Sequence, residues 1–232
     1  MTNSNFYTAL EQTFAANASR RALELASSET CTYADLDREV ARCAAALADL
    51  GLKRGDRVAV QIEKSPQSMF LYLACLRAGL VYLPLNTAYR LAELSHFLAD
   101  AEPALVVCAP SNEAGMQKLA KDTGLRAMVL TLDDAGRGSL ADAVAGARAE
   151  FSTAIVEPDE LAVIVYTSGT TGRSKGAMLS HRNLSSNARA LVDYWRFTHD
   201  DVLLHTLPIF HVHGLFVANH CGLLSGARML WR

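Results

Sequence analysis

Short apolar runs alternate with amphipathic stretches along most of this 232-residue chain. The apolar runs are rich in Val, Ile and Leu and show little alternation with polar residues. That pattern is typical of strands buried on both faces of a parallel sheet. It predicts strands at residues 56–63, 79–86, 104–109, 127–132, 161–167 and 202–207.

The stretches between these runs carry helical patterns with defined ends. In residues 33–50 apolar side chains recur every three or four positions, with Thr32 as the N-cap and Gly51 after the last turn. Ser65 and Pro66 open the next helix as its cap and its first helical residue. The same reasoning predicts helices at residues 91–101, 112–121 and 181–195, the last capped by Ser180.

The alternation of strands and helices predicts an α/β fold. Its mainly parallel β-sheet carries helices on both faces. We interpret residues 133–160 as a surface excursion that contains a short Ala-rich helix, and not as a domain boundary. Residues 226–232 have the pattern of the beginning of a further strand.

Composition excludes several classes of protein. Hydrophobic residues make up 50% of the chain and charged residues 20%, which is a globular and not a disordered composition. Lys and Arg number 22 against 24 Asp and Glu, so a net charge of -2 provides no basic field for nucleic acid or anionic lipid. No apolar run approaches the roughly 20 residues of a membrane span.

The sequence also indicates a compartment. It begins without a basic and apolar leader, and its five cysteines form no CxxC pair. We interpret these cysteines as reduced, buried or half-buried thiols, with no support for zinc or redox chemistry. The expectation is a soluble, cytoplasmic protein.

One segment has the chemistry of an anion-binding loop. From Thr167, the last residue of the apolar run 161–167, ten residues hold three glycines, five hydroxyl side chains and two cations, without an acid. Glycines let backbone N–H groups turn toward an anion, and Lys adds a point charge suited to phosphate. The carboxyl end of a parallel strand is where an open α/β sheet binds ligands. The segment predicted to bind phosphate is Thr167, Ser168, Gly169, Thr170, Thr171, Gly172, Arg173, Ser174 and Lys175.

Other kinds of loop fit this segment less well. Gly, Ser and Thr are ordinary residues of a flexible surface loop, but so many donors directly after a buried strand favour binding. The spacing G-x-x-x-x-G-K-[ST] is absent because Lys175 follows Ser174 and precedes Gly176. A G-x-G-x-x-G dinucleotide fingerprint is absent as well.

Residues 166–176, YTSGTTGRSKG, resemble the signature loop of the adenylate-forming superfamily, which includes acyl-CoA synthetases, peptide-synthetase adenylation domains and luciferases. Ser174 departs from the family pattern, in which proline is usual before the lysine, and this should loosen the loop without removing a donor. Three further segments resemble the family in order and spacing, so that the resemblance covers essentially the whole chain: TYADL at 32–36, LRAGLVYLPLN at 76–86 and LPIFHVHGL at 207–215.

The resemblance implies a reaction in two halves. A carboxylate attacks the α-phosphate of ATP in the presence of Mg2+, which gives an acyl-adenylate and pyrophosphate. The thiol of coenzyme A then takes the acyl group. Little covalent work falls to the protein, so positioned donors that hold the triphosphate explain the composition of the loop.

Five of the chain's histidines and cysteines lie close together in sequence. His211 and His213 form an H-x-H pair near His205, His220 and Cys221, but neither an acid nor a CxxC pair completes a zinc set, so no metal site is predicted. The resemblance to acyl-CoA synthetases implies that His211 lines the acyl pocket beside the substrate carboxylate. We interpret His205, His213 and His220 as packing residues.

The substrate class follows from the resemblance alone. Adenylation domains of peptide synthetases place an aspartate after the Phe that is Phe210 here, where this chain has His211, so an amino-acid substrate is not expected. Residues 84–94 and 207–211 most resemble malonyl-CoA synthetases, which activate malonate or methylmalonate. The alternatives are a ligase for a medium-chain or aromatic acid, and a non-catalytic nucleotide-binding module.

The resemblance also implies a domain organisation. The chain corresponds to an incomplete N-terminal AMP-binding domain, with a first α/β subdomain at about 56–196 and part of a second made of 1–55 with 197–232. The residues that hold adenine, ribose, Mg2+ and the second carboxylate of malonate are expected after Arg232, as is the small C-terminal domain. We therefore expect the 232 residues alone to be inactive and to bind ATP weakly.

Overall fold

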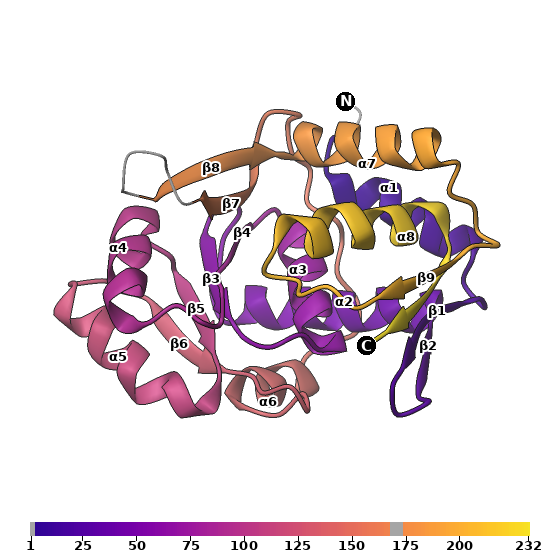
Figure 1. The fold of residues 1–232 in the computed structure, drawn as a ribbon. Helices are drawn as coiled ribbons and strands as arrows, with labels where there is room; N and C mark the ends of the chain where they lie inside the picture. Colours follow the sequence, from indigo (N-terminus) through magenta and orange to yellow (C-terminus); the bar gives the residue numbers. More distant parts are fainter. Residues whose placement is uncertain (1–2, 168–173) are drawn as a thin grey trace.

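The computed structural model describes residues 3–167 and 174–232. Neighbouring strands of the larger of its two sheets run parallel, except for the last two in the order, which are antiparallel. The order across this sheet is β6 (Met128–Thr131), β5 (Leu105–Cys108), β3 (Arg57–Gln61), β4 (Val81–Pro84), β7 (Leu161–Thr167) and β8 (Lys175–Ser180) (Figure 1).

Helices cover both faces of this sheet. Successive residues of a strand point to opposite faces, and accordingly Val58 and Val60 of β3 join one apolar cluster while Ala59 joins another. α2 (Tyr33–Asp49) and α3 (Pro66–Ala78) pack on the first face, and α4 (Leu91–Ala101) and α5 (Glu113–Asp122) pack on the second (Figure 1). The predicted α/β class with a mainly parallel sheet is confirmed.

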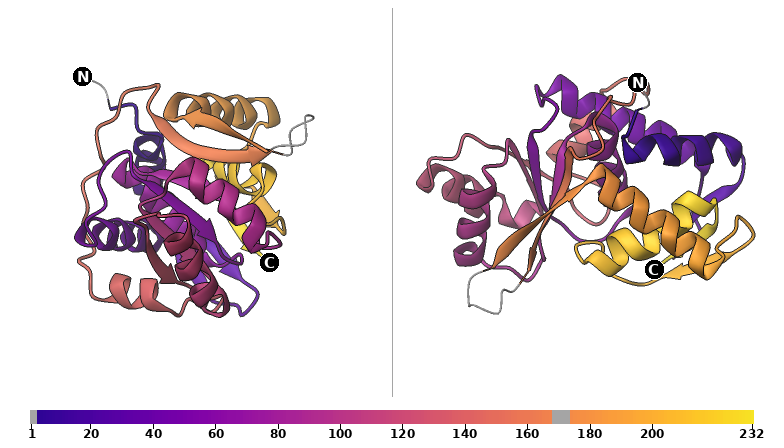
Figure 2. Two further views of the ribbon diagram at one scale, coloured as in Figure 1. Left: turned by 90° about the vertical axis from the view of Figure 1, so that its left-hand side faces the viewer. Right: turned by 90° about the horizontal axis from the view of Figure 1, so that it is seen from above.

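The second, smaller sheet pairs strands from the two ends of the chain. Its order is β2 (Thr30–Thr32), β1 (Arg21–Leu25), β10 (Arg228–Trp231) and β9 (Val202–His205). β10 runs parallel to both β1 and β9, and β2 is antiparallel to β1. Figure 2 shows this indigo and yellow part of the chain beside the larger sheet.

The remaining helices surround the two sheets. α1 (Phe6–Ala16), α7 (His181–Trp195) and α8 (Asn219–Ser225) contact one another, and α6 (Ser139–Ala145) packs on α2. A 3-10 turn, η1 (Pro110–Asn112), precedes α5, and a π-helix, η2 (His213–Ala218), leads into α8. None of the helices in residues 3–167 and 174–232 has both the length and the apolar character needed to cross a membrane.

Local signals placed the predicted helices well. α4 and α7 begin and end at the predicted residues, and Ser65 caps α3 by accepting from the Ser68 backbone N–H. Gly79, at φ 69°, ends α3 in the left-handed conformation that glycine adopts without strain.

Seven of the described elements were not predicted from the pattern: α1, β1, β2, β8, α8 and the short η1 and η2. The short segments β1 and β2 have no continuous apolar run and become strands through pairing, since β1 lies between β2 and the distant β10. β8 is an edge strand with a glycine-containing sequence in which no residue is fully buried, so its apolar signal is weak. α8 is buried along most of its length and therefore lacks an amphipathic stripe.

The two sheets share one apolar core. Leu23 of β1 and Met229 of β10 belong to the same cluster as Val58 of β3 and Val163 of β7, with α1, α2 and α3 packed between them. The larger sheet is built from strands within residues 57–180, and the smaller one from strands within 21–32 and 202–231. The division of the chain into two subdomains remains a prediction.

Candidate active site

The segment predicted to bind phosphate connects β7 to β8. Thr167 at the carboxyl end of β7 pairs with Lys175 at the start of β8, so the segment leaves and re-enters the sheet at one point. Thr167 and Lys175 are exposed and Ser174 is half-buried. The other predicted residues lie outside the described residues: Ser168, Gly169, Thr170, Thr171, Gly172 and Arg173.

Helix α4 supports both ends of this connection. On the β7 side, the Tyr166 hydroxyl donates to the Asp100 carboxylate, and the Tyr166 ring lies 4.4 Å from the ring of Phe97. On the β8 side, Nε2 of His96 lies 3.4 Å from the Ser174 carbonyl oxygen. Burial, and after it the charge and hydrogen bond of Asp100, raise the pKa of Tyr166, so the phenol keeps the proton that it donates.

Lys175 is placed to meet an anion. Its side chain is exposed, and within the described part of the chain no hydrogen bond or ion pair engages its ammonium group. A cation without a carboxylate partner is available to pair with an anionic ligand. Thr167 adds an exposed hydroxyl directly across the strand pair. The described ends of the segment can therefore offer one positive charge and neutral donors to a phosphate group.

His211 lies in the turn between β9 and the π-helix. Its side chain is exposed, and its ring lies 5.3 Å from that of Phe210. The backbone N–H of Leu215 donates to the His211 carbonyl over 2.9 Å, which fixes the end of the turn. Within the described residues, no hydrogen bond, ion pair or ring contact joins His211 to Thr167, Ser174 or Lys175.

The other histidines of this region differ in burial. His205 and His220 are buried as predicted for packing residues, but His213 is exposed, so that prediction was wrong for His213. His213 begins the π-helix, on which Gly214, Leu215 and Phe216 point inward. The helical turn therefore directs this one side chain toward solvent.

Burial holds His220 in its neutral form. It is 0% exposed, and its Nε2 lies 2.7 Å from the Tyr72 hydroxyl, while Nδ1 has no hydrogen-bond partner. Desolvation lowers the pKa of His220 from 6.5 to about 3. The unfolded chain therefore takes up a proton at higher pH than the folded chain, and stability falls as the pH drops below 6.5.

This difference predicts a pH dependence of unfolding. Between pH 6 and pH 4 the His220 site should contribute a slope of about 1.4 kcal/mol per pH unit to the free energy of unfolding. His220→Gln should lower the slope by that amount, even if its stability at pH 7 differs from that of the parent. Urea unfolding at several pH values measures both slopes, and equal slopes would contradict the prediction.

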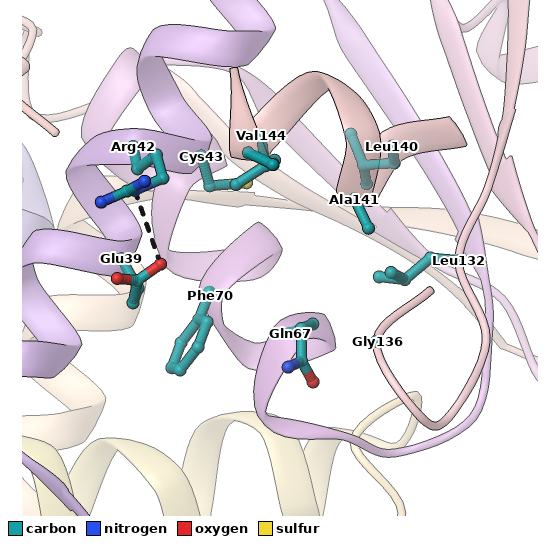
Figure 3. Close-up of a pocket in the computed structure, with 11 residues that line it drawn as sticks. Glu39, Arg42, Cys43, Gln67, Phe70, Leu132, Gly136, Leu140, Ala141 and Val144 are labelled. Atoms are coloured by element: carbon teal, nitrogen blue, oxygen red, sulfur yellow. Dashed lines mark ion pairs between the residues drawn. The ribbon is translucent and has the colours of Figure 1, made fainter. Parts of the chain in front are cut away.

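A separate pocket lies between α2, α3 and α6 (Figure 3). Its volume is about 320 Å³, and Phe70, Leu132 and Val144 give it an apolar lining. Nε of Arg42 lies 3.7 Å from the Glu39 carboxylate, so their charges offset each other. Burial raises the pKa of the Cys43 thiol to about 12, which removes it as a nucleophile. This pocket lacks the chemistry expected of an active site.

Lys64 is a further polar residue at a strand end, and no motif pointed to it. It follows β3, and its ammonium contacts His205 at the end of β9. The signal that could have found it is its position, because side chains just past the carboxyl ends of parallel strands face the ligand side of an α/β sheet. In the described ranges no three His, Cys, Asp or Glu side chains gather as metal ligands.

A mainly parallel sheet with a donor-rich connection after the carboxyl end of one strand is typical of nucleotide-binding α/β proteins, the class expected from the sequence. The chain belongs to the family described as AMP-binding enzyme, which matches residues 10–232. The resemblance to adenylate-forming enzymes of the acyl-CoA synthetase branch is thereby confirmed.

Individual relatives are similar over only part of their own length. An oxalate–CoA ligase of Arabidopsis thaliana is 33% identical over 213 residues, 90% of this chain and 41% of that protein. A malonate–CoA ligase of the same species is 32% identical over 174 residues, 72% of this chain and 28% of that protein. The crystal structure of apo MatB from Rhodopseudomonas palustris is 51% identical with a TM-score of 0.95, covering 100% of this chain and 45% of that one. Its ATP-bound structure is 52% identical, with the same TM-score and the same coverage.

Proposed function

We propose that this protein is an AMP-forming acid–CoA ligase and that its acid is malonate or methylmalonate. One observation carries the proposal. The connection rich in hydroxyls and glycines leaves the carboxyl end of β7 and returns at Lys175. Within the described residues the exposed ammonium of Lys175 makes no hydrogen bond or ion pair. The similarity to MatB over 100% of this chain supports the same conclusion.

In the first half-reaction the substrate carboxylate attacks the α-phosphate of ATP. The bond from that phosphorus to the bridging oxygen breaks, and pyrophosphate leaves with the electron pair of that bond. Mg2+ would supply a counterion for the charge of the pyrophosphate. Thr167, Lys175 and the residues between them hold the β- and γ-phosphates and stabilise the charge that develops on the leaving group. The existence of an ATP-bound MatB structure supports ATP as the nucleotide.

In the second half-reaction the thiol of coenzyme A attacks the acyl carbonyl, and AMP leaves with the electron pair of the broken C–O bond.

His211 is proposed to line the acyl pocket, where its imidazole donates to the acid. Its exposed position in the turn after β9 supports that role, because a ligand can reach the ring. The malonate–CoA ligase among the relatives supports malonate, whereas the oxalate–CoA ligase shows that the relatives differ in their acids.

The location and the organisation of the protein belong to the same proposal. We place the enzyme in the cytoplasm, where ATP and coenzyme A are supplied. We also keep the division into a first subdomain at about 56–196 and a second made of 1–55 with 197–232. The separate sheets, with β3 to β8 in one and β1, β2, β9 and β10 in the other, support this division.

A panel of acids on the whole protein tests the proposal. Malonate, methylmalonate, oxalate, octanoate and ferulate are supplied with ATP, Mg2+ and coenzyme A, and pyrophosphate release is measured. We expect malonate or methylmalonate to give the highest kcat/KM, by about tenfold or more over the other acids. A preference for octanoate or ferulate would replace malonate by the alternative acid class. Absence of pyrophosphate release with every acid would favour a non-catalytic nucleotide-binding module.

A further inference from the structure

The ammonium group of Lys64 lies where carboxyl ends of strands from both sheets meet. Lys64 follows β3 of the larger sheet, and its Nζ lies 2.6 Å from the backbone oxygen of His205, the last residue of β9. The same Nζ lies 2.9 Å from the backbone oxygen of Arg232, which follows β10. One side chain thus ties β3 to two neighbouring strands of the smaller sheet.

The third donor of the ammonium reaches the His205 ring. Nζ lies 2.9 Å from Nδ1 of His205, and Nε2 of His205 lies 3.0 Å from the Gly214 carbonyl oxygen. The carbonyl can only accept, so Nε2 carries the proton and Nδ1 accepts from Lys64. Burial, together with the nearby Lys64 charge, lowers the pKa of His205 to about 4, which keeps this neutral tautomer near pH 7.

Trp231 closes this arrangement from one side. Its ring stacks on the His205 ring at a centroid distance of 4.5 Å, and Nζ of Lys64 lies 4.4 Å from its centroid. Contact with an aromatic face favours a cation. Each donor of the ammonium has an acceptor, and the side chain is half-buried, which restricts it to this geometry.

Gly214 lies in the π-helix directly after the turn that carries His211. A Cβ on Gly214 would lie 2.2 Å from the Pro208 carbonyl oxygen, so Gly214 packs closely on the backbone of the first part of the turn. His205 directly precedes the turn, and Nε2 of its ring donates to the Gly214 carbonyl just after the turn. Lys64 donates to Nδ1 of the same ring, so its side chain stabilises both ends of the turn.

We propose that Lys64 is a positioning residue that, through His205 and Gly214, fixes the turn at residues 206–212 and with it the place of His211 in the acyl pocket. Lys64 thereby contributes to the choice among carboxylic acids without touching the acid itself. This inference rests on the proposed function, in which His211 lines that pocket. Burial lowers the pKa of Lys64 to about 8, so the ammonium is still the major form near pH 7 and can donate to its three acceptors.

Lys64→Met in the whole protein tests the proposal, because methionine keeps the apolar stem and removes every donor. We expect KM for malonate to rise about tenfold and the ranking of acids to change, with KM for ATP unchanged within about twofold. The matched control is Lys53→Met, which changes an exposed lysine in the loop before β3. A rise in KM for ATP equal to that for malonate would overturn the proposal.

A double-mutant cycle identifies the route of the effect. If Lys64 acts through His211, the double variant Lys64→Met with His211→Ala should rank the acids as His211→Ala alone does. Additive effects of the two substitutions would overturn the proposal.

Hydrogen exchange at the Leu215 amide separates the two claims. This amide donates to the His211 carbonyl, and Lys64→Met should speed its exchange about tenfold. Unchanged exchange would overturn the positioning role, whatever the acid kinetics show. A different outcome would be faster exchange in Lys64→Met together with an unchanged ranking of acids in His211→Ala. That outcome would overturn the acyl-pocket role of His211, which belongs to the proposed function.

Discussion

Replacing Lys175 by Ala in the whole protein should slow adenylate formation about 10²–10³-fold, the effect of removing one donor from a developing anion. Its exposed ammonium at the start of β8 is proposed to face the β- and γ-phosphates, which leave in this half-reaction only. Thioester formation from preformed acyl-adenylate, which contains no pyrophosphate, should change by less than about tenfold. Rapid-quench measurements of pyrophosphate and of acyl-CoA give the two rates separately.

The control for this experiment is Lys118→Ala. Lys118 lies on α5 with 76% of its side chain exposed and pairs with Asp122 one turn away, so it carries the same charge at a site unrelated to the connection. Both half-reactions should keep their rates in this variant. Equal losses in the two half-reactions of Lys175→Ala would show that Lys175 supports the fold of the strand pair or binds another group.

Replacing Arg77 by Ala should cost about 3 kcal/mol of unfolding free energy. The Arg77 side chain is only 7% exposed, and its two terminal nitrogens lie 3.0 Å from the Asp37 carboxylate and 3.1 Å from the Glu11 carboxylate. Its guanidinium carbon also lies 5.0 Å from the centroid of the Tyr7 ring. Alanine would leave two carboxylates without their cation beside the buried Tyr7 hydroxyl, which donates to Asp37 over 2.7 Å.

Arg137→Ala provides the comparison for this loss. Arg137 also makes an ion pair, with Nε 3.0 Å from the Asp133 carboxylate, but 79% of its side chain is exposed. Pairs in water contribute at most about 1 kcal/mol. Urea unfolding of the two variants under the same conditions gives the difference. If Arg77→Ala cost no more than Arg137→Ala, the Glu11–Arg77–Asp37 cluster would not stabilise the packing of α1, α2 and α3.

How far the candidate site could be predicted differs from residue to residue. The sequence singles out the segment 167–175 as a candidate, because its glycines, hydroxyls and cations are contiguous and follow an apolar strand. Its support by Tyr166 and Asp100 could not be found in this way, since 66 residues separate the two side chains in sequence. His205 and His213 are two histidines of one short segment, yet His205 is buried and His213 is exposed. Residue type alone does not predict this difference.

The sequence by itself determined the elements whose signals are local. An apolar run at 161–167 becomes β7, and the caps Thr32, Ser65 and Ser180 begin α2, α3 and α7, because these signals act within a few residues. It also determined the family, since the motifs are contiguous.

Only the tertiary structure decided which distant segments meet. β1 becomes an inner strand because β10 pairs with it some 200 positions later, and no local preference of either segment specifies that partner. In the sequence nothing distinguishes Lys64 from other charged residues. Its partners His205 and Arg232 lie 141 and 168 positions away, so its bridging place exists only once the two sheets pack on their shared core.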